Sequence, residues 1–332
     1  MISRLVSIAP MMGWTDRHAR YFLRLITEHS LLYTEMVNTG ALIHNTQKVG
    51  LQKRLLAFHA AEHPVALQLG GSDPQALASC ASMVEDAGFD EVNLNIGCPS
   101  DRVKSGNFGA CLMAQPELVA ESVSAMKAKV SIPVTVKCRI GIDDMDSYQS
   151  LEHFIDIVAE GGCDTFIIHA RNAWLKGLSP KQNREIPPLK YDYVYRLKRE
   201  KPGLNITING GIKTIESLQQ HLQHVDGVMI GREAYYNPYI LACVDRDVYH
   251  DADAGMKSRE EIIDQMCDYI DEEVASGVEL HSITRHMLGL YHGCRGAKAW
   301  RRHLSEKAHV AGADSSIVRA ALTHVTDQAS LD

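Results

Sequence analysis

The sequence of 332 residues lacks several features that mark particular classes of protein. Its eight cysteines include no C-x-x-C pair and no spacing typical of a zinc site or a small disulfide-bonded secreted domain. No run of about 18 uncharged apolar residues is present, so no membrane-spanning helix is expected. The N-terminal apolar run ends at Pro10 without the pattern of a cleaved signal peptide. We therefore expect a cytoplasmic protein with reduced thiols, no bound metal and no contact with a membrane.

Solenoid-type repeats and low-complexity segments are also absent, and a composition of 45% apolar and 23% charged residues excludes a disordered chain. The length suits one α/β barrel of about 250 residues with a smaller domain, and it suits equally well two ordinary domains of about 100–200 residues each. The net charge of −7 and the pI near 6.1 argue, over the whole chain, against a nucleic-acid partner. Nucleic-acid-binding domains are commonly basic, with a pI above about 9.

Eight short runs rich in β-branched residues recur in the first 240 residues, each followed by a loop and a helical pattern. Strands that alternate with helices predict a parallel sheet, and eight such units predict a closed (β/α)8 TIM barrel. An open doubly wound sheet is the alternative, although the first run lacks the G-x-G-x-x-G motif that would favour it. The expected strands are Leu5–Ala9, Leu32–Met36, Val65–Leu69, Glu91–Asn95, Pro133–Cys138, Thr165–His169, Asn205–Asn209 and Gly227–Ile230.

Beyond about residue 240 only helical patterns remain, so we expect a barrel over residues 1–240 and an α-helical bundle over residues 241–332. Apolar residues at spacings of three and four define the helices of both parts. Within the barrel the clearest helices are Pro74–Ala87, Pro116–Val130, Ser150–Glu160 and Thr214–His224. In the bundle they are Arg259–Ala275, Leu280–His292, Ala297–His309 and Ser315–Thr326.

Glycines follow the last two expected strands, at the end of a barrel where catalytic and binding residues gather. Asn209-Gly210-Gly211 follows the seventh strand and Gly231-Arg232 follows the eighth, each before a helical pattern. Backbone N–H groups and the helix dipole at such positions favour a phosphate group. A tight turn is the alternative for Gly210-Gly211 alone, but the two adjacent loops together predict a phosphate site.

Three polar residues at the ends of other strands suit a flat heterocyclic ligand. Lys137 ends the fifth strand, and a buried cation there needs an anionic partner such as the N1/O2 edge of a reduced flavin. Gln68 offers a donor and an acceptor to an isoalloxazine or pyrimidine ring, although an ordinary polar residue at a strand end is the alternative. His169 fits equally a hydrogen-bonded core histidine, a phosphate donor or a base.

Cys98 lies in Asn93-Leu94-Asn95-Ile96-Gly97-Cys98-Pro99-Ser100, directly after the fourth strand. A thiol at a barrel mouth can act as a nucleophile or a general acid. A small buried hydrophobe is the alternative for any single cysteine, but the position beside two asparagines favours chemistry. The cysteines expected to pack in the core are Cys80, Cys138, Cys163, Cys243 and Cys267.

The charge of the chain is unevenly distributed. Residues 243–284 carry a net charge of −9, whereas residues 171–201 carry +6 and residues 285–307 carry +5. Solvated faces are the alternative for each basic stretch, but basic residues interleaved with aromatic ones are typical of RNA contacts. Because electrostatic attraction acts over about 8–10 Å at physiological salt, an RNA responds to the local charge and not to the net charge. The residues concerned are Lys176, Lys181, Arg184, Arg295, Lys298, Arg301 and Arg302, with Trp174, Tyr191, Trp300 and His303.

Several signatures follow one another across the barrel: Ala9-Pro10-Met11, residues 91–99, Val136-Lys137-Cys138-Arg139, Ile168-His169-Ala170-Arg171, Asn209-Gly210-Gly211 and Gly231-Arg232. In this order they resemble the signatures of the flavin-dependent tRNA-dihydrouridine synthases. Residues 177–184 and 296–302 are similar to the DusA subfamily, which reduces uridines 20 and 20a of the tRNA D-loop.

The resemblance implies an FMN-binding barrel, a C-terminal helical tRNA-binding domain and NADPH as the reductant. Reduced nicotinamide delivers hydride to FMN, the flavin N5 delivers hydride to uridine C6, and Cys98 protonates C5 to give dihydrouridine. By similarity, FMN is held by Pro10, Met11, Met12, Gln68, Lys137, His169, Asn209, Gly210, Gly211, Gly231 and Arg232. The resemblance and the basic stretches together predict the residues that contact tRNA, which are Asn95, Lys181, Arg184, Arg295, Arg301 and Arg302.

We expect the protein to act as a monomer. Two alternatives to this function remain. One is a small-molecule FMN oxidoreductase of the dihydroorotate dehydrogenase type, which would not need the basic helices. The other is a non-catalytic RNA-binding protein, which would show no flavin absorbance.

Overall fold

The computed structural model describes residues 2–43, 49–100, 103, 105–253 and 255–326. The chain forms two compact units, each built from two segments. We call Met1–Met12 with Leu31–Gly231 the barrel unit, and Gly13–Ser30 with Arg232–Asp332 the helical unit. The predicted functional division at residue 240 stays a prediction, and the compact units differ from it by grouping residues 13–30 and 232–240 with the C-terminal helices.

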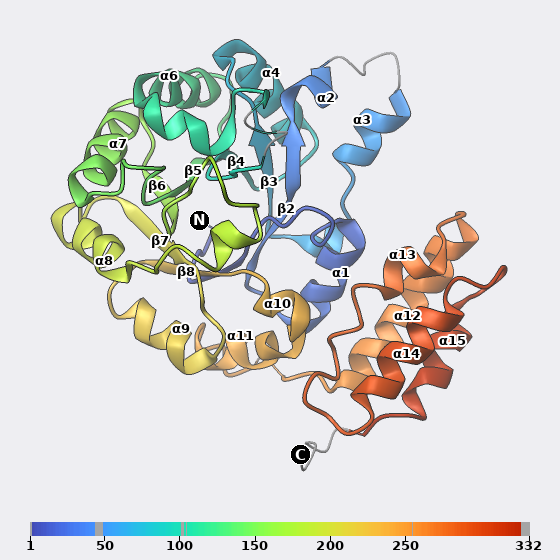
Figure 1. Ribbon diagram of the computed structural model, residues 1–332. Coiled ribbons are helices and arrows are strands. Elements are labelled where there is room, and N and C mark those ends of the chain that lie inside the picture. The colour runs from blue at the N-terminus through green and yellow to red at the C-terminus, as the bar shows by residue number, and fades with distance from the viewer. Residues whose placement is uncertain (1, 44–48, 101–102, 104, 254, 327–332) are drawn as a thin grey trace. The chain divides into compact units, whose positions relative to one another are not determined.

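Within the described residues, the barrel unit holds eight parallel strands that pair in chain order and close through β1 and β8. Figure 1 shows helices such as α4, α6, α7, α8 and α9 around these strands. The predicted TIM barrel is therefore confirmed. The strands are β1 (Val6–Ile8), β2 (Leu31–Asn38), β3 (Val65–Gly70), β4 (Glu91–Ile96), β5 (Val134–Arg139), β6 (Thr165–His169), β7 (Asn205–Asn209) and β8 (Gly227–Ile230).

Three helices of the barrel unit begin at a polar side chain that caps them. The side chains of Asp73, Ser147 and Thr214 accept hydrogen bonds from backbone N–H groups in the first turns of α4, α7 and α9. The α-helices are α2 (Thr39–Ile43), α3 (Val49–Leu55), α4 (Pro74–Asp86), α6 (Pro116–Lys127), α7 (Tyr148–Glu160), α8 (Tyr191–Glu200) and α9 (Ile215–Leu222). Short 3-10 helices are η1 (Ala60–Glu62), η2 (Gly109–Ala114) and η3 (Gln182–Arg184).

The buried residues of the barrel differ in polarity from strand to strand. One apolar core cluster combines Ala9, Leu31, Tyr33, Ala66, Ile167 and Met229. In β4, by contrast, the three alternate residues Glu91, Asn93 and Asn95 are buried and share one face of the strand. Such polar residues remain buried only when they are hydrogen-bonded.

The helical unit is built on a core of packed helices in which Trp300 is fully buried. Helix α15 packs on both α12 and α14, and α1 packs on α12 and α13. The elements are α1 (Arg17–Ile26), α10 (Glu233–Tyr236), η4 (Pro238–Cys243), α11 (Val244–Asp247), α12 (Arg259–Ala275), α13 (Leu280–Thr284), α14 (Ala297–Lys307) and α15 (Ser315–Leu322). No helix within the described ranges is long and apolar enough to cross a membrane.

The predicted helix Leu280–His292 is wrong in extent, because α13 ends at Thr284 and turns follow it. Gly289 lies in these turns, close to the backbone of another segment of the unit. A Cβ atom on Gly289 would lie 2.6 Å from the carbonyl oxygen of Tyr236 and 2.8 Å from that of Tyr235. This close backbone contact is made by residues distant in sequence, so helical periodicity could not reveal it.

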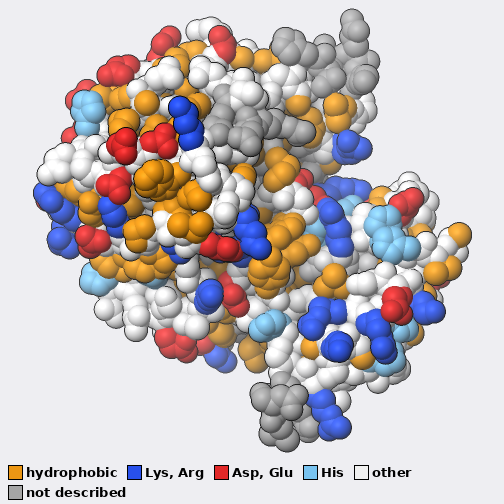
Figure 2. All heavy atoms as spheres, viewed as in Figure 1, with side chains coloured by type: hydrophobic (Ala, Val, Ile, Leu, Met, Phe, Trp, Pro, Cys, Tyr) orange, Lys and Arg blue, Asp and Glu red, His pale blue; other side chains and the backbone are white. Residues whose placement is uncertain are grey.

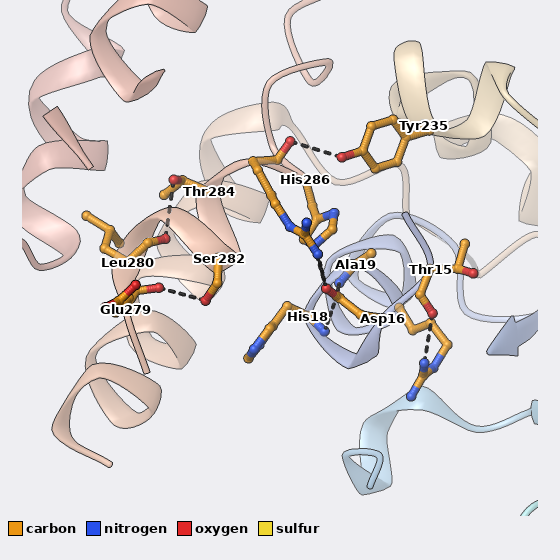
Figure 3. A network of polar contacts seen from close by, with 12 residues as sticks. Thr15, Asp16, His18, Ala19, Tyr235, Glu279, Leu280, Ser282, Thr284 and His286 are labelled. Atoms are coloured by element: carbon orange, nitrogen blue, oxygen red, sulfur yellow. Dashed lines mark hydrogen bonds and ion pairs between the residues drawn. The ribbon is translucent and has the colours of Figure 1, made fainter. Parts of the chain in front are cut away.

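A partly buried polar network joins the start of α1 to the turns after α13, as Figure 3 shows. The Asp16 carboxylate caps α1 by accepting the N–H groups of His18 and Ala19, each at 3.0 Å. Its Oδ2 atom also contacts Arg285 at 2.5 Å and His286 Nε2 at 3.0 Å. These partners hold the pKa of Asp16 well below its ordinary value, although burial alone would raise it. The network therefore ties two distant segments of the helical unit together.

Candidate active site

The predicted site residues of the middle strands lie together at the carboxyl edge of the barrel. In the parallel register Asn95 on β4 is paired with Lys137 on β5, and His169 on β6 is paired with Asn209 on β7. Gln68 on β3 joins the group because its Oε1 atom accepts a hydrogen bond from Asn95 Nδ2 at 2.7 Å. The structure thus brings together five residues that are separated by up to 141 positions in the sequence.

Lys137 is the partly buried cation of this group. Among the described residues its ammonium has one hydrogen-bond partner, Asn209 Oδ1, at 3.2 Å. Asn209 is oriented in turn by donating from Nδ2 to the carbonyl oxygen of Met229 at 2.7 Å. Burial, with a smaller effect of the charge on Arg139, lowers the pKa of Lys137 to about 8. An anionic ligand beside this ammonium would stabilise its charged form.

The Cys98 loop, residues 97–100 after β4, is held by hydrogen bonds to its backbone N–H groups and to a backbone carbonyl oxygen. Asn95 Oδ1 accepts from Gly97 N at 3.1 Å and from Cys98 N at 3.0 Å. The carbonyl oxygen of Cys98 accepts from Ala110 N at 3.0 Å. The thiol remains partly exposed, and its Sγ lies 3.5 Å from Ser100 Oγ. Cys98 is therefore an accessible thiol on a fixed backbone and not a core residue.

Gly109 allows the close approach that holds this loop. Its φ of +73° is in the left-handed region, and a Cβ atom would lie 2.8 Å from the Cys98 carbonyl oxygen and 2.3 Å from Val103 Cγ1. A side chain at this position would displace the Cys98 loop.

Arg139 is a buried residue at the site for which the sequence analysis proposed no role. Its Nε donates to the carbonyl oxygen of Gly97 at 2.9 Å, and its NH1 donates to those of Asn172 and Asn183 at 2.9 and 3.0 Å. It thereby joins the Cys98 loop to the loop that follows β6. The sequence could have indicated Arg139 through its position, because it is a second cation at the end of the fifth strand, two positions after Lys137.

His169 lies close to Gly210, the first of the two glycines after β7. Gly210 and Gly211 have φ values of +123° and +76°, and a Cβ atom on Gly210 would lie 2.8 Å from His169 Cδ2. Tyr191 OH donates to the Gly210 carbonyl oxygen at 2.6 Å. Burial, reinforced by the charges of Arg139 and Lys137, holds the pKa of His169 well below its ordinary value.

Of the three interpretations of His169, the structure offers no support for the hydrogen-bonded core histidine. Its imidazole has no hydrogen-bond partner within the part of the chain that the structure describes. It is therefore a neutral ring that can still donate to or accept from a ligand.

The remaining predicted cofactor residues come from the first and last strands. Pro10 and Met11 are partly buried after β1, and the Met12 side chain is 66% exposed. Gly231 follows β8 and ends the barrel unit, whereas Arg232 is assigned to the helical unit, where it precedes α10.

The basic residues predicted to bind tRNA are exposed in both units. Lys181 and Arg184 lie at η3 in the barrel unit, and Arg295, Arg301 and Arg302 lie before and within α14. Within the described residues, Lys181 and the three arginines at α14 have no hydrogen-bond or ion-pair partner for their side chains. Figure 2 shows Lys and Arg side chains gathered on the visible face of the helical unit.

The aromatic residues predicted to stack on RNA bases have different environments. Trp300 as a stacking residue is wrong, because it is fully buried and its Nε1 donates to the carbonyl oxygen of Met287 at 3.2 Å. Its position beside Arg301 and Arg302 in the sequence was misleading, because the same helix exposes the arginines to solvent and buries the tryptophan in the core. Trp174 is 45% exposed, so it remains available for stacking.

The family model described as "Dihydrouridine synthase (Dus)" matches residues 7–327. Among curated proteins, the tRNA-dihydrouridine(20/20a) synthase of Shewanella oneidensis is 59% identical over 98% of this chain and 95% of its own length. The proteins of the same name from Escherichia coli K12 and Vibrio cholerae are 58% and 56% identical, over 97% of this chain and 92% and 97% of their own lengths.

A solved structure of 2-naphthoyl-CoA reductase in complex with 2-naphthoyl-CoA is similar to this chain with a TM-score of 0.55. The two share 12% sequence identity, and the match covers 72% of this chain and 49% of that one. At this identity the similarity concerns the fold alone. The match to the family model and the identity with these relatives over nearly the whole chain confirm the family expected from the signatures, and the chain belongs to the dihydrouridine synthase family.

Proposed function

We propose that this protein reduces the C5=C6 bond of uridines 20 and 20a in the D-loop of tRNA, in the cytoplasm and as a monomer. The observation that carries the proposal is the position of an accessible thiol, Cys98, on a loop fixed beside Gln68, Asn95 and Lys137. The names of relatives with 56–59% identity support the substrate.

The residues of the site fit an FMN cofactor. Lys137 is a partly buried ammonium with one neutral partner among the described residues, so the anionic edge of a flavin suits it. Gln68 retains a second N–H and a second acceptor position for a ring amide. Gly210 and Gly211 have the positive φ values that leave backbone groups open to a phosphate. We propose the cofactor set Pro10, Met11, Met12, Gln68, Lys137, His169, Asn209, Gly210, Gly211, Gly231 and Arg232.

When bound and reduced by NADPH, FMN supplies the hydride that is added to uridine C6. This chain then provides the proton, which Cys98 Sγ donates to C5. Ser100 Oγ, at 3.5 Å, can return a proton to the sulfur. Asn95, whose Oδ1 holds the loop and whose Nδ2 donates to Gln68, retains one N–H that is proposed to donate to the uracil ring.

The exposed cations provide the attraction for the tRNA backbone. Lys181, Arg184, Arg295, Arg301 and Arg302 are proposed to contact phosphates, and the target uridine is then unstacked to reach the thiol. Unstacking costs a few kcal/mol, which the phosphate contacts offset.

The test uses purified protein, NADPH and a tRNA transcript without modifications. Mass spectrometry of nuclease fragments is expected to find dihydrouridine at positions 20 and 20a, and the purified protein is expected to show flavin absorbance. Reduction of free pyrimidines without tRNA would favour the small-molecule oxidoreductase instead. Protein that binds tRNA but shows no flavin absorbance would favour the non-catalytic RNA-binding protein.

A further inference from the structure

A continuous chain of side-chain hydrogen bonds runs through the barrel unit from Glu91 to the Cys98 loop. Thr135 Oγ1 donates to Glu91 Oε1 at 2.7 Å and accepts from Asn93 Nδ2 at 2.8 Å. Asn93 Oδ1 accepts from Gln68 Nε2 at 2.8 Å, and Gln68 Oε1 accepts from Asn95 Nδ2 at 2.7 Å. Asn95 Oδ1 finally accepts from Cys98 N.

Every side chain in this series is buried. Glu91, Asn93 and Thr135 are 0% exposed, Gln68 is 1% exposed and Asn95 is 8% exposed. A buried amide that loses its partner bears the full cost of desolvation, so each member strongly favours the orientation that satisfies its neighbours.

The two ends of the hydrogen-bond series independently fix which group donates and which accepts at each step. At one end the Glu91 carboxylate only accepts, and its oxygens are occupied by Arg4 at 2.5 and 2.9 Å and by Tyr33 at 2.5 Å. Thr135 must therefore donate to Glu91 and can only accept from Asn93.

At the other end the backbone N–H groups of Gly97 and Cys98 only donate, so Asn95 must present its oxygen to them. Its Nδ2 then donates to Gln68, whose Nε2 donates to Asn93. The orientations deduced from the two ends agree at every amide.

We propose that Thr135 and Asn93, anchored by Glu91, are positioning residues that fix the orientation of the Gln68 amide and of the Cys98 loop. Neither needs to touch substrate or cofactor. The inference rests on the proposed function, because these orientations affect activity only if Cys98 donates the proton and Gln68 contacts the flavin.

The test compares Thr135→Val, which keeps the shape and removes the hydroxyl, with Thr135→Ser, which keeps the hydroxyl. Thr207→Val is the matched control, since Thr207 on β7 is 1% exposed and its Oγ1 has no partner among the described residues. Asn93→Leu interrupts the chain one step nearer the site.

Two readouts do not require turnover: hydrogen exchange of the Gly97 and Cys98 amides, and the rate of Cys98 alkylation by iodoacetamide, resolved by peptide mass spectrometry. In Thr135→Val and Asn93→Leu we expect exchange about tenfold faster than in the wild type and a changed alkylation rate. The single-turnover rate of dihydrouridine formation should fall about tenfold, with the KM for tRNA nearly unchanged. Thr135→Ser should restore both readouts, and Thr207→Val should leave them at the wild-type level.

Equal exchange and alkylation in Thr135→Val and the wild type would overturn the inference, as would equal losses in Thr135→Val and Thr207→Val. Failure of the proposed function gives a different result: the wild type itself makes no dihydrouridine, while exchange and alkylation still respond to the loss of the hydroxyl. A thermal unfolding curve for each variant separates a local effect from global destabilisation.

Discussion

The candidate residues on the barrel strands and the candidate arginines of the helical unit are held in opposite ways. In the barrel unit, Gln68, Asn95 and Lys137 are bonded to one another or to neighbouring strands and are largely withdrawn from solvent. In the helical unit, Arg301 and Arg302 are exposed and have no side-chain partner among the described residues. Chemistry requires reacting groups in fixed positions, whereas attraction to a phosphate backbone tolerates mobile side chains. The difference supports our proposal of a catalytic barrel and an RNA-binding surface on the helices.

The strongest test of this comparison is Cys98→Ala. Because it removes the proposed proton donor and leaves the loop bonds of Asn95 intact, we expect dihydrouridine formation to fall by about 100-fold or more. Flavin content and the reduction of bound flavin by NADPH should remain at the wild-type level, as an absorbance spectrum will show. Cys111→Ala is the control, since Cys111 is also partly exposed and belongs to the same unit. A Cys98→Ala protein with the wild-type rate would remove the thiol from the mechanism.

The next effect concerns Lys137. Lys137→Met is expected to weaken FMN binding about 10- to 100-fold, the range expected for a lost hydrogen bond to a charged group. In the wild type the affinity should also fall as the pH rises through about 8, because the ammonium then loses its proton and its attraction for an anion. Fluorescence titrations of FMN at pH 7 and pH 9 measure both effects. A wild type and a Lys137→Met variant with the same pH dependence would show that another group binds the anionic edge.

A moderate effect is expected in the helical unit from the double substitution Arg301→Ala with Arg302→Ala. tRNA binding should weaken, and its dependence on salt concentration should decrease by about one unit of slope for each lost phosphate contact. Filter binding at several salt concentrations measures the slope. Arg319→Ala is the control, because Arg319 is exposed but already paired with Asp264 at 2.8 Å. An unchanged slope in the double variant would place the RNA surface elsewhere.

The smallest effect concerns stability and His18, a buried residue of the helical unit whose Nδ1 bonds to Tyr269 OH at 2.7 Å. Burial lowers its pKa to about 4, so between about pH 6.5 and 4 the unfolded chain binds this proton more readily than the folded one. The contribution of neutral His18 to the free energy of unfolding should therefore be complete above about pH 6.5. It should be lost as the pH falls toward 4, which lowers the free energy of unfolding by about 1–3 kcal/mol. Urea unfolding of the wild type and of His18→Gln should show this dependence in the wild type alone. The same slope in both would assign the titration to another group.

Strands were predicted well where apolar residues are bounded by polar residues that cap them. Residues 165–169, 205–209 and 227–230 are strands with the predicted limits. The second strand extends to Asn38, two residues beyond its predicted end, and its pairing with β3 is irregular between Tyr33 and Met36. The pattern of apolar residues in one strand could not predict this irregularity, because the irregularity arises from the pairing of two strands.

Candidate functional residues could be proposed from the sequence near the carboxyl ends of strands, but not among the polar residues deeper in the barrel. Cys98 and Lys137 are recognisable from their position alone, whereas Thr135 and Glu91 are ordinary polar residues until their partners from other strands are known. One local signal was available: parallel strands buried on both faces are usually continuously apolar, but residues 91–96 alternate between polar and apolar. That alternation indicates a polar interior on this side of the barrel.

The ion pair between Arg4 and Glu91 lies at the start of the hydrogen-bond series, before β1 and at the first residue of β4. Engineers of TIM barrels commonly treat the amino-terminal edge as the place for stabilising changes and the carboxyl edge as the place for altering activity. In this barrel the two edges are joined through buried side chains. A library that varies Arg4 to improve thermal tolerance is therefore expected to alter the Cys98 loop at the opposite edge as well, and should be screened for both stability and activity.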